Sequence, residues 1–268
     1  MLSQVAVIPQ SVLEVLPVSV RVSDSAGVLA ECGAYQVRLA IDEDDRHCLY
    51  RLRFLVFNLE LHEGLDAAYL DGLDRDQFDS VCDHLMVEHK GSGRIVGTYR
   101  LQTGPVADRN FGYYSAQEFD FSPYERLREQ IVECGRACIH REFRSFEVLN
   151  LLWRGIAKYS VSRGGRYLVG CSSVTSQDTN YGSAMYHRLK NYLASPELQT
   201  TPTPSYSFSL SEETVDMPQP PRLLRAYLTV GAHICGPPAL DREFKTIDFL
   251  TLLDLERMAP SARARYLR

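Results

Sequence analysis

The chain has 268 residues, a length that suits one large domain or two small ones and that can bury a substantial core. Apolar residues make up 45% and aromatic residues 10%, which is typical of a globular protein and excludes a disordered one. The net charge of −5 argues against a nucleic-acid-binding protein. No apolar stretch reaches the roughly 18 residues of a membrane-spanning helix, and the N-terminus lacks the pattern of a signal peptide. We therefore expect a cytoplasmic protein, with peripheral contact to the inner membrane as an open alternative.

Charged residues are unevenly distributed along the chain. Six aspartates and one arginine lie in residues 66–83, whereas residues 136–166 carry seven basic residues and two glutamates. This separation suggests two partners of opposite charge. The alternative is that both stretches are simply solvated surface. The seven cysteines include no CxxC pair, which favours reduced thiols and gives no indication of a metal site.

Alternation and capping signals predict the elements in chain order. We expect strands at 35–40, 83–89, 95–102, 131–140, 167–171 and 245–250, and helices that begin at Asp42 and Ser145 or span 180–194 and 223–232. This order predicts an α/β protein with a mixed (α+β) sheet and helices on both faces. Gly135 interrupts the fourth strand and marks a bulge or a close backbone approach, so we expect a functional site beside it.

The predicted elements divide the chain into three parts. Residues 1–33 are expected to be a weakly structured N-terminal extension, residues 34–194 the core, and residues 195–268 a C-terminal segment that completes the fold.

Three short motifs bring together residue types suited to chemistry. They are Arg53 and Phe57 in YRLRFLVFNLE, Asp76 and Asp79 ahead of Arg100 in IVGTYRL, and Glu133 and Arg136 in VECGRACIH. With the stretches FDSVCDHLMV, YYSAQEFDFSP, VECGRACIHREFR and LLWRGIAKY, they resemble the acyltransferase branch of the GNAT superfamily. Within it, the chain is most similar to the ornithine lipid synthase group, which is related to N-acyl amino acid synthases and acyl-homoserine-lactone synthases. The resemblance covers about residues 35–190, and the tail DREFKTID at 241–248 extends it.

This resemblance implies a GNAT-like acyl-CoA N-acyltransferase fold and a defined reaction. A long-chain (3-hydroxy)fatty acyl group would pass from acyl carrier protein to the α-amino group of an amino acid, with ornithine the favoured acceptor and a lyso-ornithine lipid the product. The donor would be a 4'-phosphopantetheine thioester, and no cofactor would be bound permanently.

One departure from the wider superfamily bears on the donor. The region before the long helix reads HREFRSFEVLN and has no glycine, although GNAT enzymes that use coenzyme A usually carry a glycine-rich loop there for the pyrophosphate. This difference fits the single phosphate of a carrier protein. The alternatives are another N-acyl amino acid synthase, an enzyme like the homoserine-lactone synthases, and a non-catalytic module that binds acyl chains or the carrier protein.

Glu133 is the expected catalytic base, because the α-ammonium group must lose a proton before its nitrogen attacks a thioester. Arg136 would position or tune it. The structural alternative is that Glu133 only forms an ion pair with Arg136, Arg100 or Arg53. Backbone N–H groups of residues 134–138 could stabilise the tetrahedral oxyanion.

The remaining residues of the motifs are expected to bind the substrates. Arg53 and Arg100 would bind a carboxylate or act as a scaffold, with Phe57 beside them. Asp76 and Asp79 would hold a cationic amino acid or pair with the same arginines to fix their loop.

The acyl donor and its carrier are assigned to the stretch after Glu133. This group consists of Cys138, His140, Arg141, Arg144, Arg154 and Lys158. Cys138 could accept the acyl group with His140 as its base, or it could be a packed core thiol. The basic residues would dock the acidic carrier protein. Aromatic residues at 113–121 would line an acyl-chain tunnel or serve as lids over the core.

Overall fold

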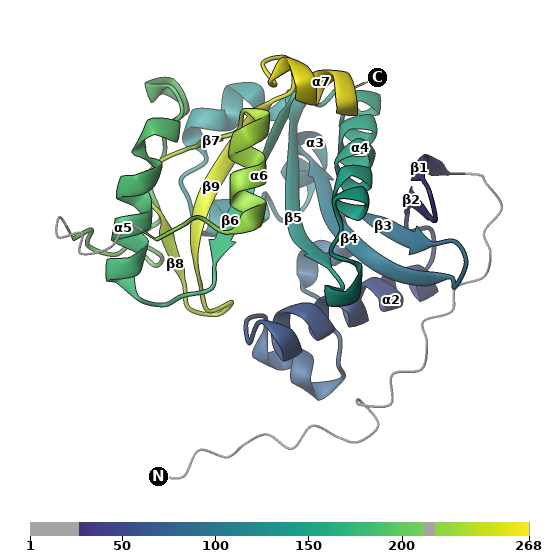
Figure 1. Ribbon diagram of the computed structural model, residues 1–268. Helices are drawn as coiled ribbons and strands as arrows, with labels where there is room; N and C mark the ends of the chain where they lie inside the picture. The colour runs from purple at the N-terminus through teal and green to yellow at the C-terminus, as the bar shows by residue number, and fades with distance from the viewer. Residues whose placement is uncertain (1–26, 212–217, 268) are drawn as a thin grey trace, which may run out of the picture.

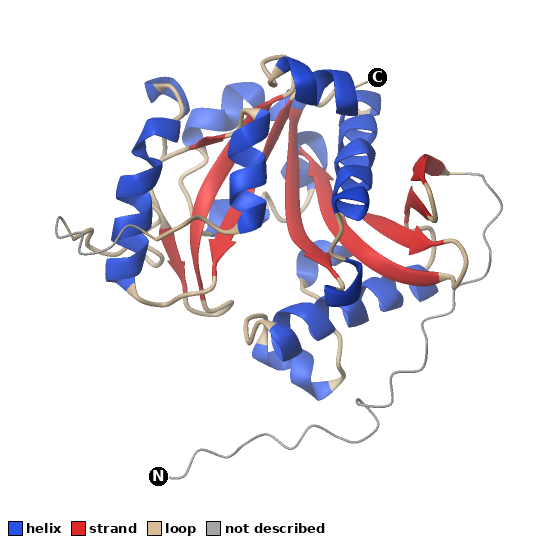
Figure 2. Ribbon diagram, viewed as in Figure 1, coloured by secondary structure: helices blue, strands red, loops and turns tan. Residues whose placement is uncertain are grey.

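A mixed β-sheet runs through the protein (Figure 2). The computed structural model describes residues 27–211 and 218–267. Over these residues the strand order is β1-β2-β3-β4-β5-β6-β9-β7, with β8 paired to β9. The strands are β1 (Val28–Cys32), β2 (Tyr35–Leu39), β3 (Asp83–His89), β4 (Arg94–Thr103), β5 (Ile131–Ile139), β6 (Tyr167–Val174), β7 (His233–Ile234), β8 (Ala239–Asp241) and β9 (Thr246–Asp254).

The helices cover both faces of this sheet (Figure 1). Helices α4 to α7 lie on one face, and α2 and α3 lie on the other. Asp42 and Ser145 cap the first turns of α2 and α4 by accepting from the backbone N–H groups of Asp45 and Val148. The α-helices are α2 (Glu43–Phe54), α3 (Gly104–Arg109), α4 (Phe146–Ser162), α5 (Thr179–Leu189), α6 (Arg222–Val230) and α7 (Pro260–Tyr266).

Short helical turns fill the connections. A π-helical turn, η1 (Leu55–Glu60), extends α2. The other turns are the 3₁₀ segments η2 (Asp66–Leu70), η3 (Gln77–Ser80), η4 (Tyr114–Gln117), η5 (Ser122–Gln130), η6 (Arg141–Phe143), η7 (Lys190–Tyr192) and η8 (Pro196–Leu198). None of the described helices is long and apolar enough to cross a membrane.

Strands β5 and β6 part after a short parallel contact. Their pairing ends at Glu133 and Val169, although both strands continue. The two backbones approach closely at the point of separation, where a Cβ added to Gly170 would lie 2.1 Å from the carbonyl oxygen of Cys134. Only glycine fits there without a backbone shift. The separation opens a gap in the middle of the sheet.

A bulge on the other side of β5 adds to this irregularity. The register between β4 and β5 shifts between the pairs Thr98–Cys138 and Arg100–Gly135. The left-handed conformation falls on Arg136, with φ of 50°, and not on Gly135. The sequence thus indicated the right segment for a bulge, but the residue that takes up the unusual backbone conformation is an arginine.

The observed architecture confirms the mixed α/β fold with helices on both faces. The strands expected in the first 171 residues are all present. Val28–Cys32 was expected to belong to a weakly structured extension, and this was wrong, because it pairs with β2 as an edge strand. The rest of that expected extension, residues 1–26, lies outside the described residues. The C-terminal strand β9 pairs with β6, so the last part of the chain contributes to the same sheet.

Candidate active site

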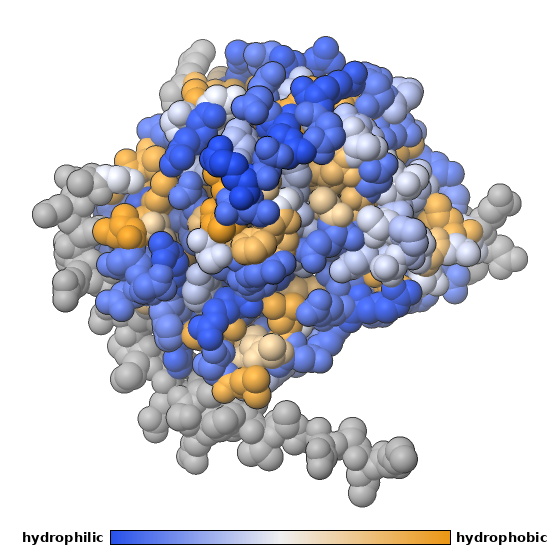
Figure 3. Space-filling model, turned by 180° about the vertical axis from the view of Figure 1, so that it is seen from behind, coloured by the Kyte–Doolittle hydropathy of each residue, from blue (hydrophilic) through white to orange (hydrophobic). Residues whose placement is uncertain are grey.

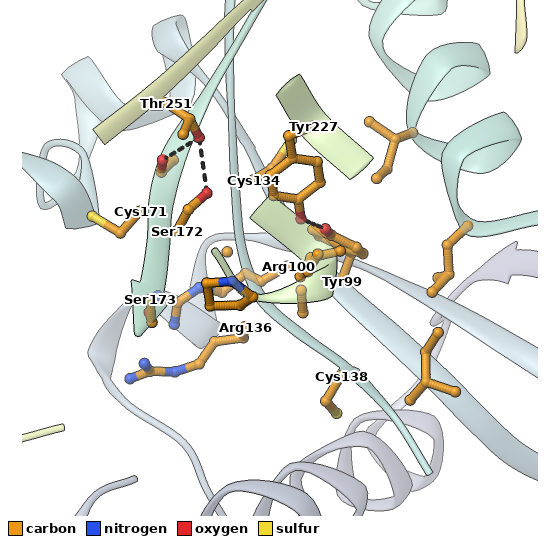
Figure 4. A pocket seen from close by; sticks show the side chains of 18 of the residues that line it. Tyr99, Arg100, Cys134, Arg136, Cys138, Cys171, Ser172, Ser173, Tyr227 and Thr251 are labelled. Atoms are coloured by element: carbon orange, nitrogen blue, oxygen red, sulfur yellow. Dashed lines mark hydrogen bonds between the residues drawn. The ribbon is translucent and has the colours of Figure 1, made fainter. Parts of the chain in front are cut away.

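A cavity of about 850 Å³ lies at the gap between β5 and β6 (Figure 4). Its walls come from both faces of the sheet. On the face of α4 and α6 they are mainly apolar, with Leu152, Trp153 and Leu168 among them. On the other face they carry polar and acidic side chains, including Ser115 and Glu133. The cavity therefore joins an apolar compartment to a polar one through the sheet.

Glu133 lies buried in the wall of this cavity, with 5% of its surface exposed. Its two carboxylate oxygens accept from the backbone N–H groups of Tyr114, at 2.9 Å, and Ser115, at 2.8 Å. Burial raises the pKa of Glu133, and the two backbone donors oppose that shift. The alternative of an ion pair with an arginine does not describe its contacts. Because each oxygen has a further lone pair, the carboxylate can accept another proton donor.

A buried network of arginines and aspartates stands beside the cavity. Arg53 donates to Asp79 at 2.8 Å, and Arg100 and Arg136 donate to Asp76 at 2.6 and 2.8 Å. The aspartates also form a capping box at the start of η3. Burial alone would raise the pKa of Asp79, but the charges of Arg53 and Arg100 hold it well below its usual range. The network is therefore a set of ionised groups paired with one another, although Nε of Arg53 and Nε of Arg136 have no hydrogen-bond partner among the described residues.

These contacts match one of the two roles that the sequence left open for the loop aspartates, which is pairing with the arginines. Asp76 and Asp79 pair with the arginines and lie outside the cavity lining, as does Arg53. Phe57, Arg100 and Arg136 do line it. Arg136 pairs with Asp74 and Asp76 and does not contact Glu133, and its guanidinium lies 4.4 Å from the ring centroid of Phe244.

The thiol expected to interact with the acyl donor is a packed one. Cys138 lines the cavity but belongs to a core cluster with Leu52 and Met86, and only 6% of its surface is exposed. Burial raises its pKa to about 12, so the reactive thiolate is scarce. His140 accepts from the backbone N–H of Glu142 at 3.3 Å and caps the turn η6. These contacts favour the alternative of a core thiol.

The expected carrier-docking residues separate into two places. Arg141 and Arg144 precede α4, and Arg144 lines the cavity while pairing with Glu60. Arg154 and Lys158 lie two and three turns into the helix, where they donate to backbone carbonyls of β1 at 2.9 and 2.7 Å. Carrier docking by these four residues stays a prediction, and the second pair also holds an edge strand in place.

Several residues of the cavity had no role in the sequence analysis. Tyr99 and Tyr227 join their hydroxyl groups across its apolar part (Figure 4). Trp153 packs edge-on against Tyr227, with ring centroids 5.3 Å apart. Of the expected tunnel aromatics only Tyr114 lines the cavity, whereas Tyr113, Phe119 and Phe121 pack in a core cluster. The amphipathic pattern of α6 could have predicted that Tyr227 lies on its inward face. No local pattern predicts which helix that face packs against.

Comparisons with known proteins agree with this geometry. Residues 52–154 match the model of the acetyltransferase (GNAT) domain family. The chain is 30% identical over 259 residues to an L-ornithine Nα-acyltransferase of Agrobacterium fabrum, covering 91% of this chain and 88% of that protein. It is 30% identical over 254 residues to an enzyme of the same name from Brucella abortus, covering 87% and 88%. FeeM, an N-acyl amino acid synthase from uncultured soil microbes, has a similar fold, with a TM-score of 0.51, 11% identity and coverage of 87% and 95%.

Proposed function

The chain belongs to the L-ornithine Nα-acyltransferase family, and from this premise we propose that it transfers a long-chain acyl group from acyl carrier protein to the α-amino group of ornithine. The product would be a lyso-ornithine lipid. Membership of this family makes the chain an N-acyltransferase and removes the alternative of a non-catalytic binding module. The 4'-phosphopantetheine thioester would be a substrate of each turnover.

One observation carries the proposal: a buried carboxylate with free lone pairs lies at the gap in the sheet, between an apolar and a polar compartment. Glu133 takes a proton from the α-ammonium group, directly or through a water. The freed amine attacks the thioester carbonyl and forms the new C–N bond. The intermediate then loses a second proton from nitrogen, the C–S bond breaks, and the departing thiolate takes up one proton.

The backbone of β5 beyond Glu133 is suited to the developing negative charge. Its ladder with β6 ends at Glu133, so the edge of residues 134–138 that faces β6 borders the gap, while the other edge pairs with β4. Their N–H groups are the proposed oxyanion donors. Arg136 holds this segment in place through Asp74 and Asp76, which is a positioning role.

The acyl chain is assigned to the apolar compartment between α4 and α6. Phe146 and Trp153 from α4 and Leu223 and Tyr227 from α6 line it. Burial of a long alkyl chain there would contribute about 0.8 kcal/mol for each methylene removed from water.

The N-terminal ends of α4 and α6 form the proposed docking site for the carrier. Arg144 and Arg222 lie there at the edge of the cavity, and the side chain of Arg222 is exposed. Two helix N-termini and two guanidinium groups suit the phosphate of the pantetheine arm and an acidic protein behind it.

The reaction itself is the direct test. The purified chain is incubated with palmitoyl acyl carrier protein and L-ornithine, and mass spectrometry follows the amide and the free carrier thiol. We expect both to appear in equal amounts, with the acyl group on the α-nitrogen. Absence of an amide with ornithine and with a panel of other amino acids would contradict the proposal.

A further inference from the structure

A second group of carboxylates faces the polar compartment and has no basic partner in the part of the chain that the structure describes. Glu63, Asp241 and Asp248 line the cavity, and Glu118 lies behind them. All four are between 1% and 5% exposed. We call these four residues the acidic wall. They come from the loop after η1, the end of η4, β8 and β9.

The acidic wall has no basic partner among the described residues, and burial raises the pKa of Glu63 to about 7 and that of Asp248 to about 6. Among the described residues no lysine, arginine or histidine forms an ion pair with any of the four. The two cations of the same segment point elsewhere, since Arg242 donates to a backbone carbonyl of Ser205 and Lys245 pairs with Asp66. The arginines of the cavity's inner wall, Arg100 and Arg136, are already paired with the loop aspartates.

Unpartnered oxygen atoms are the second feature of this group. Both carboxylate oxygens of Glu118 and Oδ1 of Asp248 are buried without a hydrogen-bond partner among the described residues. Ligating atoms of Glu118, Cys171 and Asp248 lie within 4.8 Å of one another. Buried polar atoms without partners are costly, so a ligand that donates to several acceptors would remove that cost.

The acidic wall and the proposed base lie on the same face of the sheet. Glu133 pairs with Val169, and Cys171 follows Val169 by two residues on β6, which is about 6.6 Å along the strand. Asp248 pairs with Ser173, a further two residues along. The separation of Glu133 from the acidic wall therefore suits an extended amino acid. Its α-nitrogen would lie near Glu133 and its terminal nitrogen at the acidic wall.

We propose that the acidic wall binds the side-chain ammonium group of the acceptor amino acid. This inference rests on the proposed N-acylation and adds the residues that select a cationic acceptor. The three unpartnered oxygen atoms, two on Glu118 and one on Asp248, match in number the three donors of one –NH₃⁺ group. Because carboxylates favour the charged form of an amine, the bound terminal nitrogen stays protonated and cannot attack the thioester. The acidic wall would thus determine both the choice of acceptor and the position of the amide on the α-nitrogen.

A neutral analogue of the acceptor tests the inference on the unmodified protein. L-norvaline has the carbon chain of L-ornithine without the terminal amine. With palmitoyl acyl carrier protein as donor, we expect kcat/KM for ornithine to exceed that for norvaline by about 10²-fold, the scale of a buried contact to a charged group. Equal values for the two acceptors would overturn the inference while leaving the N-acyltransferase proposal intact. Failure of both acceptors would instead contradict the proposed function.

Variants of the acidic wall provide the matching test. In Asp248→Asn and Glu118→Gln we expect KM for ornithine to rise by about 10²-fold, norvaline kinetics to be retained, and some acyl group to appear on the terminal nitrogen. Asp66→Asn removes an exposed carboxylate and is the control for charge. An equal loss with both acceptors in a folded variant would overturn the inference, as would activity that depends on a metal and is abolished by EDTA. If the variants do not fold, the norvaline comparison still decides.

Discussion

As the proposed base, Glu133 would combine a structural and a chemical task in one carboxylate. Its two oxygens hold the backbone of Tyr114 and Ser115 in place, and the same oxygens face the cavity. Burial raises the pKa of the group, which strengthens it as a base relative to an exposed glutamate. The two backbone N–H donors keep it ionisable. The environment of the proposed base thus depends on a turn that comes almost 20 residues earlier in the chain.

Replacing Glu133 with glutamine separates these two tasks. The amide can still accept from one backbone N–H group but cannot take a proton. We expect kcat to fall by about 10²- to 10⁴-fold, the usual contribution of a general base, while the thermal unfolding midpoint shows that the protein stays folded. Near-normal turnover at neutral pH would show that the proton leaves by another route.

Glu63 provides a prediction on pH and stability. Burial raises its pKa from 4.5 to about 7, with the hydroxyl of Thr175 opposing the shift. The folded protein therefore holds this proton more tightly than the unfolded chain, and stability is lost as the pH rises from about 4.5 to about 7. Glu63→Gln keeps an acceptor for Thr175 and removes the titration.

We expect the Glu63→Gln protein to gain stability relative to the parent as the pH increases. The gain at pH 8 over pH 5 should approach roughly 2–3 kcal/mol, because one pKa unit corresponds to about 1.4 kcal/mol. Denaturant unfolding at the two pH values, without amino acid present, measures it. A difference between the two proteins that does not change with pH would show that Glu63 titrates normally.

At the scale of elements, the separation of β5 and β6 depends on one glycine. A Cβ on Gly170 would lie 2.1 Å from the backbone oxygen of Cys134, and a backbone atom cannot move as a side-chain tip can. We expect Gly170→Ala to lower the free energy of unfolding by about 1–3 kcal/mol and to reduce turnover by shifting the gap.

Gly135→Ala is the matched control for this substitution. It adds the same methyl group to the neighbouring strand, where nothing lies within 4 Å of the new Cβ and the backbone conformation is ordinary. Equal destabilisation by the two alanines, measured by chemical unfolding, would show that the close contact at Gly170 is not what limits the separation of the strands.

The sequence predicted the positions of the helices and strands better than it predicted which of them are in contact. Alternation and capping were sufficient for the central strands and for α2 and α4, because these signals are local. They missed β1, a strand of five residues whose last two are exposed at the edge of the sheet. They could not report that Arg154 and Lys158 hold this strand, because that contact joins residues more than 120 positions apart.

Part of the proposed site could be chosen from the sequence in the same way. The E-x-x-R motif led to Glu133, since a charged pair on an apolar strand is conspicuous. The acidic wall was not predictable in the same way. Glu118 and Asp248 lie in stretches that resemble the family, but only the tertiary fold brings them within 4.8 Å. The pairing of Asp76 and Asp79 with arginines also required the structure, because either partner was compatible with the spacing.

Over the whole molecule, the gap in the sheet separates two environments. The face of α4 and α6 offers an apolar compartment with cations at its edge, and the opposite face offers the acidic wall. The surface seen from behind carries hydrophobic residues only in small groups among hydrophilic ones (Figure 3). A lipid-like donor and a cationic acceptor would thus approach Glu133 from different sides of the sheet.

This arrangement predicts that reversing the charge at the cavity edge affects the donor and not the acceptor. In Arg222→Glu, and more strongly with Arg144→Glu added, we expect KM for palmitoyl acyl carrier protein to rise by about 10-fold at low salt, because electrostatic attraction to the acidic carrier is lost. The difference from the parent should shrink as salt rises, since screening weakens the parent's attraction too. KM for ornithine should not change.

Two comparisons make this prediction specific to the cavity edge. Arg126→Glu introduces the same charge change at an exposed site on η5, across the sheet from α4 and α6, and should leave KM for the carrier unaltered. Arg154→Glu and Lys158→Glu should mainly lower the unfolding midpoint, because these side chains hold carbonyl groups of β1. The contrary outcome is that KM for the carrier rises in the Arg154 and Lys158 variants but not in Arg222→Glu. The docking site would then lie further along α4, away from the cavity and toward the edge of the sheet.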